Sequence, residues 1–155
     1  MAERFETHWQ IPAQVGNIER VITEANVIFD RFALESHDRF GLNLLVWEAL
    51  TNAVLHGCAQ QPAALVDCRL RYQEGPDCKE VVIEVTDPGP GFDWQQAVGR
   101  ESASLAPYSL PEEPLAESGR GLMIYLIYAT RFEFNPAGNR VTLHRELDKG
   151  RDKHE

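Results

Sequence analysis

The chain is 155 residues long, which is the size of one domain and enough to bury a hydrophobic core without disulfides or structural metals. Hydrophobic residues make up 43% and charged residues 25%, so the composition argues against a disordered or fibrous chain. The net charge of −9 disfavours direct binding to nucleic acid, because that binding depends on clustered Lys and Arg side chains.

The first third of the chain predicts one strand followed by two helices. Residues 5–11 alternate aromatic or β-branched side chains with polar ones and stop at Pro12, a pattern typical of a strand at a sheet edge. Apolar residues then recur at steps of three and four, which predicts an amphipathic helix over residues 14–34. A second helix is expected over residues 38–55, with Gly57 in the position favoured for a helix C-cap.

The middle of the chain predicts a β-hairpin and then a long connection. Residues 63–73 and 79–86 are apolar and β-branched, and the turn-forming residues 74–77 separate them. Residues 93–118 contain prolines, serines and glutamates with no sustained apolar period. Connections of this length inside compact domains are usually lids or disordered segments.

The last part of the chain predicts a helix, a second hairpin and a charged tail. Residues 122–129 are strongly apolar and helix-like, and residues 131–135 and 140–147 suit two strands around a Pro-Ala-Gly-Asn turn. The tail, residues 148–155, is almost wholly charged and is expected to be frayed and flexible. This order of elements predicts an α+β fold, a two-layer sandwich in which helices cover one face of a mixed, mostly antiparallel sheet.

The cysteines and the apolar runs predict a cytoplasmic protein. Cys58, Cys68 and Cys78 form no C-x-x-C pair, so they indicate neither a zinc site nor a disulfide framework. We interpret them as reduced thiols. No apolar run reaches the ~18 residues of a membrane span, and residues 1–10 lack the apolar region of a signal peptide. We therefore expect neither membrane insertion nor export.

Three polar residues of the second predicted helix, Glu48, Asn52 and His56, follow one another at steps of four. An α-helix returns to nearly the same face every four residues, so the three side chains would form one stripe that could face a ligand. The same spacing is also what the solvated side of an ordinary amphipathic helix gives. The stripe therefore needs support from elsewhere in the chain.

Two glycine clusters follow this helix in the sequence. Residues 87–92 (DPGPGF) come at the end of an apolar strand, where alternating Pro and Gly make a rigid turn whose backbone can approach a ligand closely. Residues 119–122 (GRGL) open a helix, and N–H groups at a helix N-terminus can bind an anion such as phosphate. Each cluster alone is also compatible with an ordinary turn or helix start.

Together and in this order, the three stretches resemble the motifs of the GHKL ATPases, the group that contains gyrase-type ATPases and histidine kinases. Residues 48–57 (EALTNAVLHG) resemble the N-box of that group, residues 87–92 its first glycine box and residues 119–122 its second. The resemblance spans residues 5–147 and implies the Bergerat fold of histidine-kinase-like ATPases. Within the group, the compact length and the E-A-x-x-N-A-x-x-H-G form resemble the anti-sigma-factor serine/threonine kinases of bacterial partner-switching systems.

The resemblance implies a role for residues of the first two motifs. Asn52 would hold a Mg²⁺ ion that bridges the ATP phosphates, and Glu48 would take the proton from the hydroxyl group of a partner's serine. Asp87 would accept a hydrogen bond from the adenine amino group, while Gly89 and Gly91 would leave room for the base.

The resemblance also implies how the phosphates are bound. Gly119, Gly121 and the amide of Leu122 would cradle them, and residues 93–118 would be the ATP lid. Residues 1–147 would then form a single ATP-binding kinase domain.

Four features are left open by the resemblance. Residues 129–130 are Ala-Thr where these kinases often have Met-Asp, and residues 138–140 replace the Gly-Thr common in the wider group. These departures leave kinase competence and the details of the adenine pocket open. We interpret His56 as a structural helix cap, or as a residue that supports the site without contacting the ligand, rather than as a catalyst, and Arg120 as a solvent-exposed residue.

The sequence therefore predicts an ATP-dependent serine/threonine kinase that is also an anti-sigma factor. It would phosphorylate an anti-anti-sigma (antagonist) protein and sequester a sigma factor or a related regulator. The alternative is a nucleotide-gated module that binds its partner without transferring phosphate. A homodimer is expected by resemblance alone.

Overall fold

The structure, a computed structural model, describes residues 3–58, 61–95 and 117–147, and for residues 117–120 it describes the backbone alone. The elements follow in the order β1 (Arg4–Pro12), α1 (Val15–Arg31), α2 (Ser36–Asn52), η1 (Ala53–Gly57), β2 (Leu65–Glu74), β3 (Lys79–Thr86), α4 (Glu117–Tyr128), β4 (Arg131–Phe134) and β5 (Arg140–Glu146).

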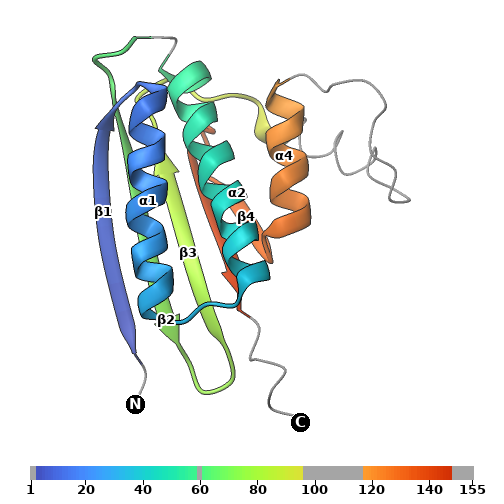
Figure 1. Cartoon of the computed structure of the whole chain (residues 1–155). Helices are drawn as coiled ribbons and strands as arrows, with labels where there is room; N and C mark the ends of the chain where they lie inside the picture. The colour runs from blue at the N-terminus through green and yellow to red at the C-terminus, as the bar shows by residue number, and fades with distance from the viewer. Residues whose placement is uncertain (1–2, 59–60, 96–116, 148–155) are drawn as a thin grey trace.

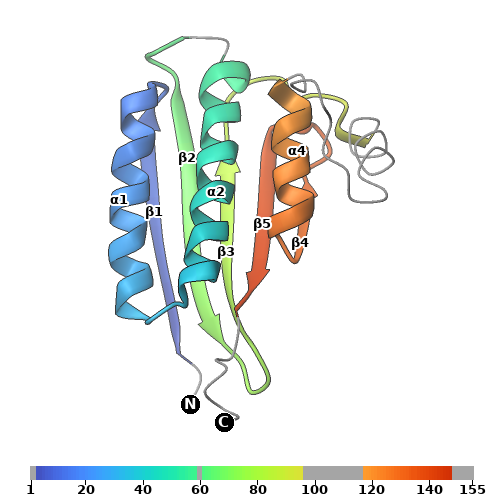
Figure 2. The same ribbon diagram turned by 45° about the vertical axis from the view of Figure 1, so that its right-hand side comes forward.

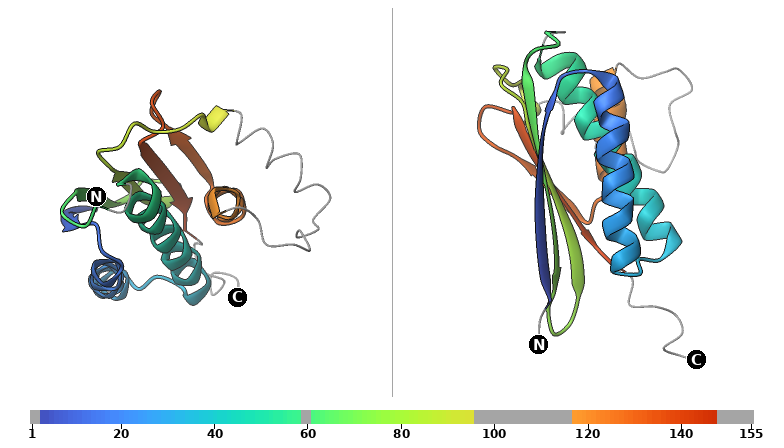
Figure 3. Two further views of the ribbon diagram at one scale, coloured as in Figure 1. Left: turned by 90° about the horizontal axis from the view of Figure 1, so that it is seen from above. Right: turned by 60° about the vertical axis from the view of Figure 1, so that its left-hand side comes forward.

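The strands form a five-stranded sheet in the order β1-β2-β3-β5-β4. Helices α1, α2 and α4 lie side by side on one face of this sheet (Figure 1, Figure 2), and the view from above shows the two layers (Figure 3). The predicted two-layer α+β sandwich is confirmed. All four pairings between described strands are antiparallel, so the described sheet contains no parallel pair, although a mixed sheet was expected.

The core forms because the two apolar patterns of the sequence face each other. Val81, Ile83 and Val85 alternate along β3 and belong to one buried cluster with the apolar stripe of α1, which includes Ile18 and Phe29. A stripe that repeats every three or four residues lies on one face of a helix, so α1 can cover the strands with that face. Full burial of an apolar side chain of this size stabilises the fold by about 1.5–3 kcal/mol.

The second predicted helix ends differently from the expectation. It is α-helical only as far as Asn52, and residues 53–57 form a π-helical turn, η1. The N–H of Cys58 donates to the carbonyl of Ala53, five residues earlier, at 2.9 Å. Gly57 therefore lies inside the turn, and Cys58 occupies the cap position, so the predicted C-cap role of Gly57 is wrong. Such π-helical turns are frequent at functional sites.

The third helix begins earlier than expected. Helix α4 starts at Glu117, before the apolar stretch of residues 122–129 that was expected to be helical, and Gly119 and Gly121 lie in its first turns, in agreement with a motif that opens a helix. The predicted lid falls mostly on residues 96–116, outside the described residues, and the predicted tail, residues 148–155, lies outside them as well.

An ion pair with a buried carboxylate joins β5 to the beginning of α2 and the end of α4. Nε of Arg145 donates to Oδ1 of Asp38 at 3.0 Å, and Nη1 of Arg145 donates to the carbonyl of Tyr128 at 2.6 Å. Asp38 is only 2% exposed. The carbonyl of Tyr128 belongs to the last turn of α4, whose carbonyls have no partner inside the helix. Arg145 therefore anchors both helices to the sheet.

Within the described ranges, no helix is both long and apolar enough to pass through a membrane. Cys58 and Cys68 are buried free thiols, and Cys78 is an exposed one.

Candidate functional site

A pocket of about 340 Å³ is formed by the end of α2, η1, the loop after β3, α4 and the β4–β5 hairpin. Helix α2 contributes Asn52, the loop contributes Asp87, and α4 contributes Leu122 and Tyr125. The hairpin contributes Asn139 among other residues. Because β3 and β5 are antiparallel, the end of β3 lies next to the beginning of β5, and residues far apart in the sequence meet at one edge of the fold.

Asn52 is the last residue of α2, and its side chain lies against α4. A β-carbon built on Gly121 would lie 2.5 Å from Nδ2 of Asn52 and 3.7 Å from its Oδ1. Nδ2 is also 3.5 Å from the hydroxyl of Tyr125, at the long limit of a hydrogen bond. The amide nitrogen of Asn52 therefore faces α4, which leaves Oδ1 as the amide atom that can serve a ligand.

Glu48 lies one helical turn before Asn52 and is 4% exposed. Burial raises the pKa of Tyr125, the hydrogen bond with Asn52 lowers it, and the nearby charge of Glu48 raises it again. Among the described residues, Asn52 lines the pocket and Glu48 does not. Glu48 is thus buried next to the pocket-lining residue Ala49, and its charge acts on Tyr125 of α4.

Asp87 follows β3 directly and lines the pocket. Its Oδ1 accepts the N–H of Gly89 at 2.8 Å. On the side of η1, a β-carbon built on Gly57 would lie only 2.2 Å from Cγ of Asp87. Burial raises the pKa of Asp87, and the hydrogen bond from Gly89 acts in the opposite direction. A partly buried carboxylate in a pocket is an acceptor for an N–H donor of a ligand.

Glycines let the loop after β3 lie directly on two neighbouring backbones. A β-carbon on Gly89 would lie 2.1 Å from the carbonyl oxygen of Gly57, and one on Gly91 would lie 1.8 Å from that of Ala137. Gly91 has a φ of +85°, in the left-handed region that favours glycine. The N–H of Phe92 donates to the carbonyl of Ala137 at 3.1 Å. The loop is thereby held between η1 and the β4–β5 turn.

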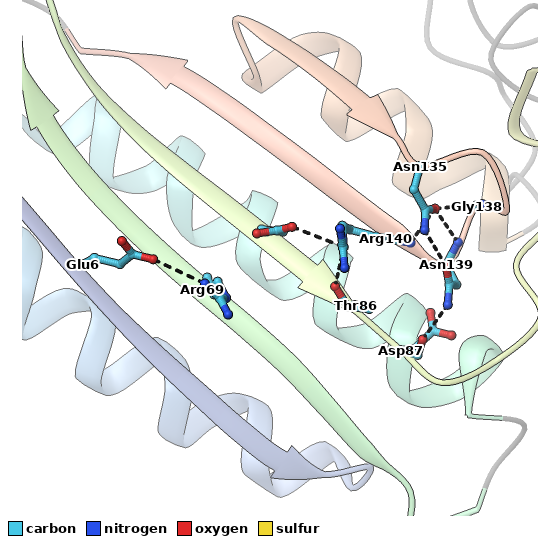
Figure 4. A network of polar contacts seen from close by, with 9 residues as sticks. Glu6, Arg69, Thr86, Asp87, Asn135, Gly138, Asn139 and Arg140 are labelled. Carbon is cyan, nitrogen blue, oxygen red and sulfur yellow. Dashed lines mark hydrogen bonds and ion pairs between the residues drawn. The ribbon is translucent and has the colours of Figure 1, made fainter.

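The β4–β5 turn brings a polar side chain to Asp87 (Figure 4). Nδ2 of Asn139 donates to the carbonyl of Asp87 at 2.9 Å, and the N–H of Asp87 donates to the carbonyl of Asn139 at 3.0 Å. The sequence identified Asn139 as a turn residue and as part of a departure from the family pattern, but not as a site residue. In the structure it lines the pocket and contacts the residue predicted to bind the base.

Aromatic rings form much of the apolar wall. Phe92 and Phe134 line the pocket and meet edge to face, with ring centroids 5.3 Å apart. The ring of Trp94 stacks on Phe134 at 5.6 Å, and the ring of Tyr125 lies 6.5 Å from Phe134. Aromatic faces and edges of this kind suit a flat, apolar ring in a ligand.

The structure brings several of the predicted site residues together. Asn52, Asp87, Gly91 and Leu122 all line the pocket, as does the exposed side chain of His56. Among the described residues, Gly89 does not line the pocket. Its backbone instead lies close to the carbonyl oxygen of Gly57 in η1.

The phosphate-binding role of the second glycine box stays a prediction. Gly119 lies in the first turn of α4, where N–H groups have no partner inside the helix. Gly121 lies further along the helix, where the absence of a side chain makes room for Asn52. The side chain of Arg120 lies outside the described part of the structure.

Comparison with known proteins gives one family. The model of the histidine kinase-like ATPase domain matches residues 11–145. The matched stretch contains every residue that lines the pocket, from Ala49 to Val141. No curated protein matches the chain.

Proposed function

The chain belongs to the histidine kinase-like ATPase family, and we propose that it is an ATP-dependent serine/threonine kinase and anti-sigma factor. It would phosphorylate an antagonist protein and sequester a sigma factor or related regulator. One observation carries the proposal: a single pocket has the amide of Asn52 on one wall and the carboxylate of Asp87 on another, with Glu48 buried one turn before Asn52.

The residues of the pocket fit a bound Mg-ATP. Asp87 offers a partly buried acceptor that can receive the adenine amino group, and the ring of Phe134 offers an apolar surface for the base. Oδ1 of Asn52 is a hard oxygen ligand of the type Mg²⁺ accepts, and Mg²⁺ takes its other ligands from phosphates and water. When bound, the ion would neutralise charge on the phosphates.

The residues of the chain would then divide the work of phosphoryl transfer. Asp87 would hold the base, and Asn52 would hold the ion that neutralises charge on the phosphates. Glu48 accepts the proton of a partner's serine hydroxyl as its oxygen bonds to the γ-phosphorus, and the bond from that phosphorus to the β–γ bridging oxygen breaks. ADP leaves, and the partner carries the phosphate.

The assignment to partner switching rests on the form of the first motif. The residue pattern from Glu48 to Gly57 is similar to that of the anti-sigma-factor kinases.

The departure from the family pattern at residues 129–130 can be explained by the hydrogen bonds of Thr130. The N–H of Thr130 donates to the carbonyl of His144 at 2.7 Å, and the hydroxyl of Thr130 accepts the N–H of Glu146 at 2.8 Å. Thr130 thus fastens the end of α4 to β5, which is compatible with an intact kinase site.

A second function is favoured by the position of Glu48. Its 4% exposure and its place beside the pocket lining suit a protein that binds ATP or ADP and holds a partner without transferring phosphate. In that case nucleotide binding would change the affinity for the partner, and Glu48 would have only a structural role.

The two functions are separated by a transfer assay. The protein is incubated with Mg-ATP labelled at the γ-phosphate and a candidate antagonist protein from the same genome, and label on the antagonist is measured. The kinase proposal expects label on a serine or threonine. ATP binding by calorimetry together with no transfer to an antagonist that forms a complex would rule out the kinase and leave the binding module.

A further inference from the structure

The β4–β5 turn is fixed from inside by one side chain. Oδ1 of Asn135 accepts the N–H groups of Gly138 at 2.9 Å, Asn139 at 3.0 Å and Arg140 at 3.1 Å. An amide oxygen accepts hydrogen bonds and an amide nitrogen donates them. The three N–H groups therefore determine which way the amide of Asn135 faces.

The orientation of the Asn135 amide in turn determines the orientation of the Asn139 amide. Nδ2 of Asn135 donates to Oδ1 of Asn139 at 2.7 Å, so the amide of Asn139 must present its nitrogen on the opposite side. There Nδ2 donates to the carbonyl of Asp87 at 2.9 Å (Figure 4). Since the N–H of Asp87 also donates to the carbonyl of Asn139, both peptide groups of Asp87 are held by one residue.

Asp87 needs this support because it lies just beyond the sheet. The ladder between β3 and β5 ends at the pair of Thr86 and Arg140. The side chain of Asn139 continues the ladder by one more hydrogen bond. A rotation of the Asp87 carbonyl would also move its carboxylate, which already touches the backbone of Gly57.

We infer that Asn139 is a positioning residue that sets the preference of the pocket for adenine over guanine by fixing the carboxylate of Asp87. The inference rests on the proposed function, because it takes Asp87 to be the residue that receives the base. Adenine carries a donor amino group where guanine carries an acceptor oxygen. A carboxylate held at that point accepts from adenine and repels guanine, so the discrimination depends on where the carboxylate is held.

The test is the isosteric substitution Asn139→Asp. It keeps an oxygen for the Nδ2 group of Asn135, removes the donor that faces Asp87 and adds a negative charge there. Titration calorimetry of the full chain with Mg-ATP and with Mg-GTP gives two Kd values and their ratio. Wild type is expected to prefer ATP. The variant is expected to lose about tenfold in ATP affinity and little in GTP affinity, as for one lost hydrogen bond to a buried group.

A second variant and a matched control make the result specific. Asn139→Ala removes the donor without adding charge and should shift the ATP-to-GTP ratio in the same direction. Asn43→Asp makes the same chemical change in another amide pair, where Nδ2 of Asn26 donates to Oδ1 of Asn43 at 2.9 Å. That variant should be less stable in a thermal melt but keep the wild-type ratio.

The outcomes separate this inference from the proposed function. A wild-type ratio in both Asn139 variants, with ATP still bound by wild type, would overturn the inference and leave the proposed function standing. A wild type that binds neither nucleotide would overturn both. An equal fall of the ratio in Asn43→Asp would show that the effect is a general loss of structure, which also overturns the inference.

Discussion

The carboxylate of Asp87 lies against the backbone of Gly57, so closely that a β-carbon built on Gly57 would be 2.2 Å from Cγ of Asp87. No side chain larger than hydrogen fits between them. Gly57 is the last residue of η1, a π-helical turn in which hydrogen bonds join residues five apart instead of the usual four. The end of the first motif and the start of the second are thus a single packed unit.

We expect Gly57→Ala to lower the affinity for Mg-ATP by more than about tenfold. The new methyl group would displace the carboxylate of Asp87 and cost its hydrogen bond to the base, which is worth about 1–3 kcal/mol when the acceptor is buried. Titration calorimetry measures the loss. The matched control is Gly16→Ala on α1, where the described residues place no atom within 4 Å of the added carbon other than the adjacent backbone of the helix. That variant should bind ATP as wild type does and gain up to about 1 kcal/mol in stability.

We expect Gly121→Ala to weaken binding through Asn52. A β-carbon there would lie 2.5 Å from Nδ2 of Asn52, so the amide would have to turn away from α4. Since Oδ1 is the proposed ligand of the ion, the loss should appear in titrations with Mg-ATP and be much smaller for ATP measured in EDTA. Equal losses with and without Mg²⁺ would contradict the role given to Asn52.

The sequence predicted the main parts of this site because their signals are local. The order of the three motifs predicted that Asn52, Asp87 and Leu122 belong to one site, and all three line the same pocket. The alternation of side chains along the strands predicted the sheet. The contact between Gly57 and Asp87 could not be predicted in this way, because analysis by α-helical period assumes an α-helix up to the end of the motif. The π-helical turn breaks that period just where the two motifs meet.

The contact of Asn139 with Asp87 could not be predicted from the sequence for a different reason. The composition of residues 136–139 predicts a turn, and that prediction is confirmed by the structure between β4 and β5. Whether a turn residue reaches another strand depends on the register between strands, which is set by the pairing of Thr86 with Arg140. Register is a property of the assembled sheet, so a polar residue in a turn carries no signal of its partner.

Asp87→Asn should raise stability at neutral pH and lower ATP affinity. Burial raises the pKa of Asp87, so the ionised form is the costly one in the folded protein. That cost is fully present above the raised pKa and is relieved as the pH falls through it. The gain in Tm of the variant over wild type should therefore be largest at neutral pH and shrink in acid. A gain that is constant over this range would contradict the assignment.

The same substitution tests the contact with the base. The new amide oxygen of the Asp87→Asn variant would accept the N–H of Gly89, as Oδ1 of Asp87 does, and the new NH₂ group would face the adenine amino group. Two donors would then oppose each other, so we expect a loss of more than about tenfold in ATP affinity, measured by calorimetry at neutral pH.

The ion pair between Asp38 and Arg145 should be a large contribution to stability. Asp38→Ala leaves the Arg145 guanidinium with an uncompensated charge at a site where the carboxylate was 2% exposed, so we expect a loss of about 3–5 kcal/mol in urea unfolding. The control is Asp30→Ala, which removes the ion pair of Asp30 with Arg39. The side chain of Asp30 is 68% exposed in that pair. That change should cost less than about 1 kcal/mol, and similar costs for both variants would contradict the argument.

The roles of Glu48 and Asn52 can be separated by one pair of substitutions. Glu48→Gln keeps the shape of a side chain that is 4% exposed but cannot accept the proton of a serine hydroxyl. We expect it to retain Mg-ATP affinity and to lose at least about a hundredfold in the rate of transfer to the antagonist, the contribution typical of a general base. Asn52→Ala removes the proposed ion ligand and should weaken Mg-ATP binding itself. A Glu48→Gln variant with the wild-type transfer rate would mean that another group takes the proton. The nucleotide site at Asn52 would be unaffected by that result, because Asn52 lines the pocket and Glu48 does not.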